Sequence, residues 1–362
     1  MTTPEGVWSL PQEREPSAAL PPLGRPTNDY IALKRLMKER GLLDKQPAYY
    51  TVRILFNTAL YLLSVSLFFI IDDFRLHLLN AVLLAFAYTH IAFVAHNSGH
   101  RQICRTVRQD DLLTVLFMGL GLGVSATWWV DKHNEHHGHP NVLDMDPDID
   151  FPMIAFSEEQ AESKKGWARF IVKYQAFFYP FLILFVPLNM RLHSVLKIQR
   201  GEAKYPVLEA ALMVIHFSIY FTILFTQLTV LQAIVFFFFH HALIGLYLAS
   251  VFAANHKGMP VLEKDSELDF LTLQVITARN VKAHPLTDFL YGGLNYQVEH
   301  HLFPTMPENK LREAQVLVKA FCEERGLSYY ETGFIQSQKE VLSHLHQVSA
   351  PLRARKQAGA TG

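Results

Sequence analysis

Long apolar stretches alternate with short polar connectors along most of this chain. Each stretch approaches the roughly 20 residues that a helix needs to cross the hydrocarbon core of a bilayer. The connector between the first two stretches reads DDFRLH, and the connector between the last two reads TQLTVLQ. Each of these pairs is therefore predicted to form a helical hairpin through the membrane. The apolar stretches fall at residues 51–71, 78–95, 112–130, 171–189, 207–227 and 230–254.

Cations flank the two predicted hairpins unequally. The short connectors carry few of them, whereas Lys and Arg are frequent at residues 34–45 and 101–108. The positive-inside rule then places both chain ends and the long central region in the cytoplasm.

Histidines gather in three short segments, each predicted to lie at the cytoplasmic edge of a hairpin. The segments read HNSGH at 96–100, HNEHH at 133–137 and QVEHH at 297–301. Side chains three and four residues apart share one face of a helix, so each segment can offer two or three ligands to one centre. The residues concerned are His96, His100, His133, His136, His137, Gln297, His300 and His301.

The two middle apolar stretches decide whether these clusters share one side of the membrane. If both crossed, the first two clusters would lie on opposite sides. Residues 171–189 contain Lys173, Gln175 and Pro180 and continue into NMRLHSVLKIQR, a pattern typical of a helix in the membrane interface. We therefore predict an all-α, multi-pass membrane protein with two transmembrane hairpins (four spans), interfacial helices and a cytoplasmic histidine-rich cap.

Composition narrows the classes of function. Half of the 362 residues are hydrophobic, and the 33 Lys and Arg equal the 33 Asp and Glu in number, so no nucleic-acid partner is expected. The two cysteines, Cys104 and Cys322, provide neither a disulfide framework nor a cysteine zinc site. Residues 1–27 read as a disordered leader without a signal peptide, residues 28–345 as one membrane domain, and residues 346–362 as a disordered basic tail.

Seven or eight imidazoles exceed the three or four ligands that one zinc ion takes, so the count indicates two metal ions. Iron is favoured, because a membrane protein with a thiolate-free dinuclear histidine site is suited to activating oxygen against inert hydrocarbon. Isolated histidines in apolar helices are usually packed or hydrogen-bonded, and we expect this of His90, His216, His240 and His241. His77, His193 and His284 are also expected to be structural.

The three histidine segments together resemble those of the membrane fatty acid desaturase superfamily. The longer runs KHNEHHGHPN and GGLNYQVEHHLFPTMP are similar to its front-end and acyl-lipid branch, and the likeness covers residues 50–330. It implies a non-haem di-iron centre that uses O2 and two electrons to remove two hydrogens from a fatty acyl chain, carried as acyl-CoA or acyl-lipid. It also implies that the seven clustered histidines bind iron and that His256, in ANHKGMP, is a further ligand.

Two departures from the family pattern limit this resemblance. Gln297 stands where many relatives have histidine, and an amide is a weaker ligand. Some front-end relatives carry a fused cytochrome b5 domain with an HPGG string, which this sequence does not contain. Electrons are then expected from a separate ferredoxin, or from a cytochrome b5 with its reductase.

Several neighbouring residues have competing interpretations. Asp131, Glu135 and Glu299 are candidates to accept a hydrogen bond from a ligating histidine, but exposed positions are equally compatible with their pattern. The acidic run DMDPDID at 144–150 lacks the Gly and Glu of a calcium loop and is interpreted as a solvated or docking loop. The adjacent Trp128 and Trp129 are expected to anchor the interface or, as the weaker alternative, to line an acyl entrance. The string GLGLG at 119–123 predicts close helix packing.

Two other classes of function remain open at this point. A di-iron hydroxylase or oxygenase would use the same ligands, and only its product would distinguish it. A histidine-rich membrane metal transporter would place ionisable ligands at mid-membrane depth. Here the clustered ligands lie at one side, which favours an enzyme.

Overall fold

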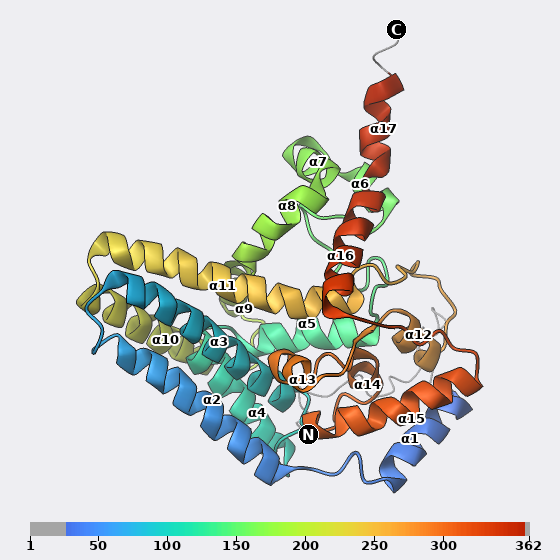
Figure 1. Ribbon diagram of the computed structural model, residues 1–362, viewed down its shortest axis with the longest axis horizontal. Coiled ribbons are helices and arrows are strands. Elements are labelled where there is room, and N and C mark those ends of the chain that lie inside the picture. The colour runs from blue at the N-terminus through green and yellow to red at the C-terminus, as the bar shows by residue number, and fades with distance from the viewer. Residues whose placement is uncertain (1–26, 359–362) are drawn as a thin grey trace.

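The computed structural model describes residues 27–358, and helices dominate this part of the chain (Figure 1). The predicted leader lies outside the described residues except for Thr27. The side chain of Thr27 accepts a hydrogen bond from the Tyr30 backbone and so caps α1 (Asn28–Glu39).

Four long helices lie where the hydropathy pattern predicts the two hairpins. They are α2 (Pro47–Leu67), α3 (Phe74–Gly99), α10 (Pro206–Gln227) and α11 (Val230–His256). The turns α2–α3 and α10–α11 lie at the same end of the molecule, on the left of Figure 1. The opposite ends of α3 and α11 carry the histidines of HNSGH and ANHKGMP.

The middle apolar stretch is sharply bent. It consists of α4 (Val107–Leu116), the π-helical η1 (Phe117–Leu122) and α5 (Ala126–Gly138), and the helix direction turns by 112° between η1 and α5. Gly123 forms the bend with a φ of +65°, and a Cβ on it would lie 2.6 Å from the ring of His216. On Gly119 a Cβ would lie 2.8 Å from Leu212. The close helix packing predicted for GLGLG is therefore present.

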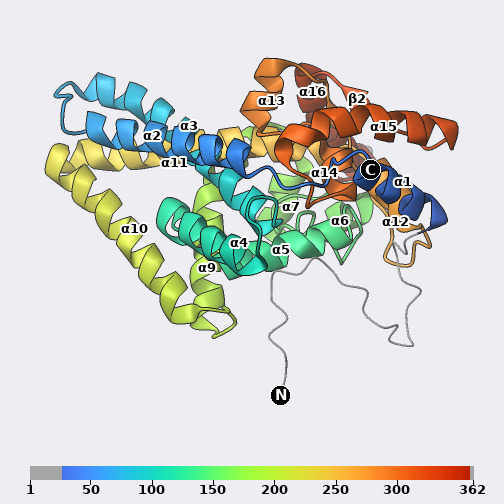
Figure 2. The same cartoon turned by 90° about the horizontal axis from the view of Figure 1, so that it is seen from below.

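The second middle stretch is also broken. It contains α6 (Glu158–Ser163), α7 (Gly166–Lys173), α8 (Gln175–Leu182), η2 (Ile183–Phe185) and α9 (Val186–Gln199). By length and composition, residues 175–199 form a fifth helical segment capable of crossing a membrane, and the bent pair would make a sixth. Figure 2 shows α4, α5 and α9 on one side of the layer formed by α2, α3 and α11.

Short helices after α11, together with α1, form a cap at the histidine-bearing ends. They are α12 (Phe270–Ile276), α13 (Pro285–Tyr291), α14 (Gln297–Leu302), η3 (Glu308–Lys310) and α15 (Leu311–Glu324). The parallel two-residue strands β1 (Asn280–Val281) and β2 (Glu331–Thr332) join this cap. Its apolar core includes the buried side chains Leu33, Met37, Leu302 and Val318.

The end of the described chain differs from the disordered tail expected after residue 345. Helix α16 (Phe334–Val348) continues across that boundary, and α17 (Ala350–Ala358) follows it. Val348 and Leu352 are buried beside Ala161 and Val172 of α6 and α7. These apolar contacts order a segment whose basic composition suggested a loose tail.

Candidate metal centre

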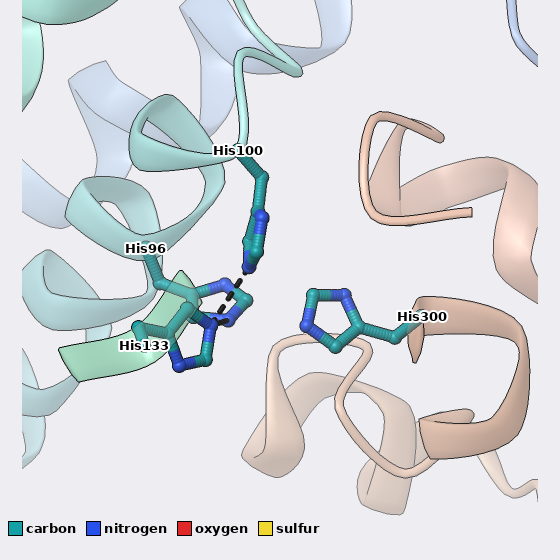
Figure 3. Close-up of side chains that lie close together, drawn as sticks. All are labelled: His96, His100, His133 and His300. Atoms are coloured by element: carbon teal, nitrogen blue, oxygen red, sulfur yellow. Dashed lines mark hydrogen bonds between the residues drawn. The ribbon is translucent and has the colours of Figure 1, made fainter. Parts of the chain in front are cut away.

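Eight histidines from four helices converge at the cap-facing end of the long helices. Helix α3 brings His96 and its C-cap His100, α5 brings the second cluster, α11 ends at His256, and α14 brings the third cluster. Figure 3 shows His96, His100, His133 and His300 pointing toward one another. Within each cluster, the helical spacing directs the histidines to one side of their helix. The fold then brings His96 and His300, about two hundred residues apart in the chain, into one group.

The first group contains His96, His100, His133 and His300, whose candidate ligand nitrogens all lie within 4.8 Å of one another. Nε2 of His133 lies 2.8 Å from Nε2 of His100 and 3.1 Å from Nε2 of His96. One imidazole nitrogen carries either one proton or one lone pair, so it cannot satisfy several such neighbours by hydrogen bonds. A shared cation resolves this conflict, because cis ligands at about 2.1 Å from a metal lie about 3.0 Å apart.

The second group contains His136, His256 and His301. Nε2 of His136 lies 3.3 Å from Nε2 of His256, and Nε2 of His301 is buried without a hydrogen-bond partner among the described residues. His137 joins the two groups: its ring stacks on His301 at 4.1 Å between centroids, and its Nε2 lies 3.1 Å from that of His133. The donor set is therefore compatible with two neighbouring metal ions.

The histidines of α14 are in the neutral form that a metal ligand requires. Burial and the surrounding imidazoles hold the pKa values of His300 and His301 well below the usual range for histidine. Both rings are almost fully enclosed by protein. Their lone pairs are therefore free at neutral pH.

Helix α5 is held at its N-terminus by a buried carboxylate from α10. Ser125 caps α5, and Glu209 accepts hydrogen bonds from Ser125 Oγ and Thr127 Oγ1, both at 2.5 Å, and from the Thr127 amide at 3.2 Å. Negative charge at a helix N-terminus is favoured by the exposed N–H groups and the helix dipole. This contact fixes the direction in which α5 presents the second histidine cluster.

Polar partners orient the rings of His136, His256 and His301. Both carboxylate oxygens of Asp146 lie 3.0 Å from Nδ1 of His136. The Gln274 side chain accepts from Nδ1 of His301 at 2.8 Å and donates to the backbone carbonyl of His137 at 2.9 Å. Nδ1 of His256 lies 3.0 Å from the Thr277 carbonyl. In each ring the opposite nitrogen, Nε2, is thereby directed to the centre.

A different chain of contacts supports the first cluster. Oδ1 of Asn97 lies 3.2 Å from Nδ1 of His96, and the Asn97 amide donates to Glu308 at 3.0 Å. Glu308 in turn accepts from Arg53 of α2 at 2.9 Å. His96 is thus linked to the cap through one amide and one partly buried carboxylate.

Asp131, Glu135 and Glu299 were expected to accept hydrogen bonds from ligating histidines, but they have other partners or are exposed. Asp131 pairs with Lys197 at 2.9 Å, and Glu135 is exposed. Glu299 accepts hydrogen bonds from Asn280 and from the Tyr329 hydroxyl, at 2.6 and 2.8 Å. Burial raises the pKa of Glu299 to about 7, against the opposing effect of those two hydrogen bonds.

The supporting carboxylate is Asp146, which sequence analysis assigned to a solvated loop. It is 1% exposed and also accepts from the amides of Asn141 and Asp148, both at 2.8 Å. The signal available in the sequence was the short distance of the acidic run from HNEHH. Gln274, Asn97 and Glu308 were also missed, and their isolated positions carry no comparable pattern.

Gln297 lies at the second group, with its Nε2 2.9 Å from Nε2 of His256. Its Oε1 accepts from Asn255 at 2.8 Å, so in this arrangement the amide oxygen is turned away from the histidines. Trp129 stacks on His133 at 4.5 Å between centroids and also contacts His96, which makes it a wall of the centre. Trp128 instead stacks on His193.

The remaining histidines of the apolar helices are packed, as predicted. His216 and His241 bond to the backbone carbonyls of Leu120 and Phe237, at 2.9 and 2.7 Å. The other rings also have partners: His77 contacts the Ile71 carbonyl, His90 the Tyr247 hydroxyl, and His240 the Tyr220 hydroxyl. His284 caps α13.

Comparisons with known proteins identify the family of this chain. Residues 74–333 match the family described as "Fatty acid desaturase". Delta(6)-fatty-acid desaturase fat-3 of Caenorhabditis elegans is 29% identical over 339 residues, which cover 89% of this chain and 75% of the relative. Delta(5) fatty acid desaturase fat-4 of the same organism is 28% identical, with coverages of 84% and 71%. Delta(8)-fatty-acid desaturase of Euglena gracilis is also 28% identical, with coverages of 87% and 78%.

Proposed function

We propose that this chain, which belongs to the fatty acid desaturase family, introduces a carbon–carbon double bond into a fatty acyl chain at a histidine-bound metal centre. The observation that carries the proposal is the convergence of eight buried or partly buried imidazoles in two adjoining groups. The clustered lone pairs fit two cations, and the surrounding apolar helices suit a lipid substrate.

Two non-haem iron ions are the metals we propose. His96, His100, His133 and His300 would hold one, and His136, His256 and His301 the other, with His137 within reach of both. Gln297 is at most a weak ligand. When bound, the irons supply the redox chemistry in which O2, two electrons and two protons combine with two acyl hydrogens to give the double bond and two waters.

The protein contributes positioning and exclusion of water. Asp146, Gln274 and the Thr277 carbonyl hold the Nδ1 sides of their histidines, so the ligand nitrogens are oriented before metal binds. Trp129 and the cap helices close the centre from solvent. A fixed and dry ligand set lets the position of the acyl chain decide which bond is oxidised.

The location of the ligands supports a topology of four spans. Both hairpin turns lie at one end of the long helices (Figure 1), and His96 and His256 lie at the opposite ends of α3 and α11. With α2, α3, α10 and α11 crossing the bilayer, the bent pair and residues 175–199 would enter the membrane or its interface without crossing. Both chain ends and the metal centre would then face the cytoplasm, in agreement with the cation distribution.

The relatives named above act, by their names, on fatty acids at the Delta(5), Delta(6) or Delta(8) position. We propose a fatty acyl substrate for this chain, as acyl-CoA or acyl-lipid, with the new bond on the carboxyl side of an existing one. Electrons would come from an external ferredoxin, or from a cytochrome b5 with its reductase.

The decisive experiment is gas chromatography and mass spectrometry of total fatty acids from a desaturase-poor host that expresses this chain. The matched control is the same host with His136→Ala, at equal membrane expression. A new unsaturated acid that is absent from the control is expected, and derivatisation locates its bond. A hydroxylated acid would assign the chain to the oxygenase alternative. An unchanged profile, with iron bound and an electron donor present, would overturn the acyl substrate.

A further inference from the structure

Helix α11 ends at His256, a member of the second histidine group, and one arginine holds this end of the helix. The last carbonyls of a helix have no partner within it, so they need donors from elsewhere. Arg279, directly before β1, supplies three donors. Its backbone amide donates to the Asn255 carbonyl at 2.9 Å, its Nε to the Ala254 carbonyl, and its Nη2 to the Lys257 carbonyl. Carbonyls on both sides of His256 along the chain are therefore bound to one residue.

The Arg279 side chain is fully enclosed by protein. A cation at a helix C-terminus is favoured by the helix dipole. Glu340 of α16 balances this charge, because its Oε2 accepts from Nη1 of Arg279 at 2.6 Å. Nη2 also donates to the Ser337 carbonyl of the same helix at 3.3 Å. The guanidinium therefore joins the end of α11 to α16.

The turn that follows α11 is fitted closely to this ion pair. Gly258 has a φ of +92°, which favours glycine. A Cβ on it would lie 3.2 Å from the backbone carbonyl oxygen of Glu340 and 3.5 Å from Nη1 of Arg279. Helix α16 thus packs against the two residues that follow His256 without space for a further side chain.

The segment that contains Arg279 also contacts the His256 ring. The carbonyl of Thr277, two residues earlier, lies 3.0 Å from Nδ1 of His256, which leaves Nε2 for a metal. Asn141 donates to the His256 carbonyl at 3.0 Å. Both the ring and the backbone of His256 are therefore held, so the position of Nε2 depends on residues 277–279.

We propose that Arg279 is a positioning residue for the metal bound by the second group, and that Glu340 holds Arg279 in this role. The guanidinium fixes the end of α11, and with it Nε2 of His256, without touching metal or substrate. Its planar fork can reach several carbonyls and a carboxylate at once, which an ammonium group cannot. Helix α16, which supplies none of the proposed ligands, then takes part in metal retention. This inference rests on the proposed role of His256 as a ligand.

The test is anaerobic titration of the full chain in nanodiscs with Fe²⁺, without substrate or electron donor. Metal analysis gives the number of sites and the affinity of each, and the unsubstituted chain is expected to bind two ions. Arg279→Gln should weaken one site about 10- to 100-fold and leave the other unchanged. Arg279→Lys, which keeps the charge but loses the fork, should weaken the same site by a smaller factor. Unchanged binding, or equal weakening of both sites, in Arg279→Gln would overturn the proposal.

Arg325 provides a matched control, because it also lies at the C-terminus of a helix. It follows α15, donates to the Phe321 carbonyl at 3.5 Å and pairs with Asp29 of α1 at 3.0 Å. These contacts hold the end of a helix that carries none of the proposed ligands. Arg325→Gln should therefore bind both ions with the affinities of the unsubstituted chain.

A second variant decides the matter if Arg279→Gln does not fold. Glu340→Ala removes the counter-ion but leaves the donors of Arg279 in place, and it should weaken the same single site. Weakening of both sites or of neither would overturn the proposal. His256→Ala distinguishes this failure from a failure of the proposed function. Two ions bound by His256→Ala would show that His256 is not a ligand, whereas loss of one ion there and of none in the other variants would refute only this inference.

Discussion

The carboxylate of Asp146 lies 3.0 Å from Nδ1 of His136, on the side of the ring opposite to Nε2, which faces His256. This contact sets the tautomer of His136, because the ring donates its Nδ1 proton and leaves a lone pair on Nε2. The same carboxylate accepts two backbone amides of its own loop, from Asn141 and Asp148. The loop after the second cluster is thus folded around the Asp146 carboxylate, which orients the His136 ring.

Replacement of Asp146 by Asn should therefore damage the centre without removing a ligand. The amide brings a donor to a position surrounded by three donors, so the His136 ring loses its fixed orientation. We expect a 10- to 100-fold loss in iron affinity or in desaturase activity. Iron content of the purified protein and product yield measure the effect. Asp150→Asn, at an exposed position of the same acidic run, is the matched control and should retain both.

The geometry at His256 predicts different roles for His256 and Gln297 in metal binding. Gln297 reaches His256 through its amide nitrogen, while its oxygen accepts from Asn255. We expect Gln297→Ala to keep two irons per chain, with at most about a tenfold loss of activity. His256→Ala should lose one iron. Equal loss of iron in both variants would show that the amide turns its oxygen to the metal, and would make Gln297 a ligand.

Much of this architecture is visible in the sequence because local pattern determines it. The four long helices follow from apolar length, and the histidines of each cluster share a helix face because of their three- and four-residue spacing. The grouping of His300 with His96 depends on tertiary folding. Here the family resemblance implied a shared centre, and periodicity alone could not have paired the two.

The residues that sequence reasoning missed act through contacts that no local pattern encodes. Asp146 lies in a loop whose acidic composition is typical of a solvated surface, yet the fold buries it against His136. Glu308 and Arg53 are 255 positions apart. The bend at Gly123 could not be predicted from hydropathy, because the residues on both sides of it are apolar.

That bend gives a prediction with an internal control. Gly123 and Gly201 both have positive φ angles, +65° and +72°, so alanine at either costs about 1–2 kcal/mol of backbone strain. At Gly201 no atom lies within 4 Å of the added Cβ, whereas at Gly123 the Cβ would lie 2.6 Å from the His216 ring. Gly123→Ala should therefore lower the thermal unfolding midpoint more than Gly201→Ala, and it should also reduce iron content. Equal midpoints would show that the His216 ring moves aside freely.

The ion pair of Arg53 and Glu308 yields the last prediction. Their side chains are only 12% and 9% exposed, and the pair connects α2 with the cap and, through Asn97, with the ligand His96. Glu308→Gln leaves the Arg53 charge buried without its counter-ion, so we expect a loss of about 3 kcal/mol in the free energy of unfolding.

A double variant isolates the cause of that loss. Adding Arg53→Met to Glu308→Gln removes the stranded charge, so it should recover part of the stability measured by thermal or denaturant unfolding in detergent. The control is Lys319→Gln, which breaks the more exposed pair with Glu331 and should cost less than about 1 kcal/mol. If the double variant were as unstable as the sum of its singles, the pair would not be coupled. The stabilising effect of Glu308 would then be assigned to its hydrogen bond with Asn97, and its loss should also lower the iron content.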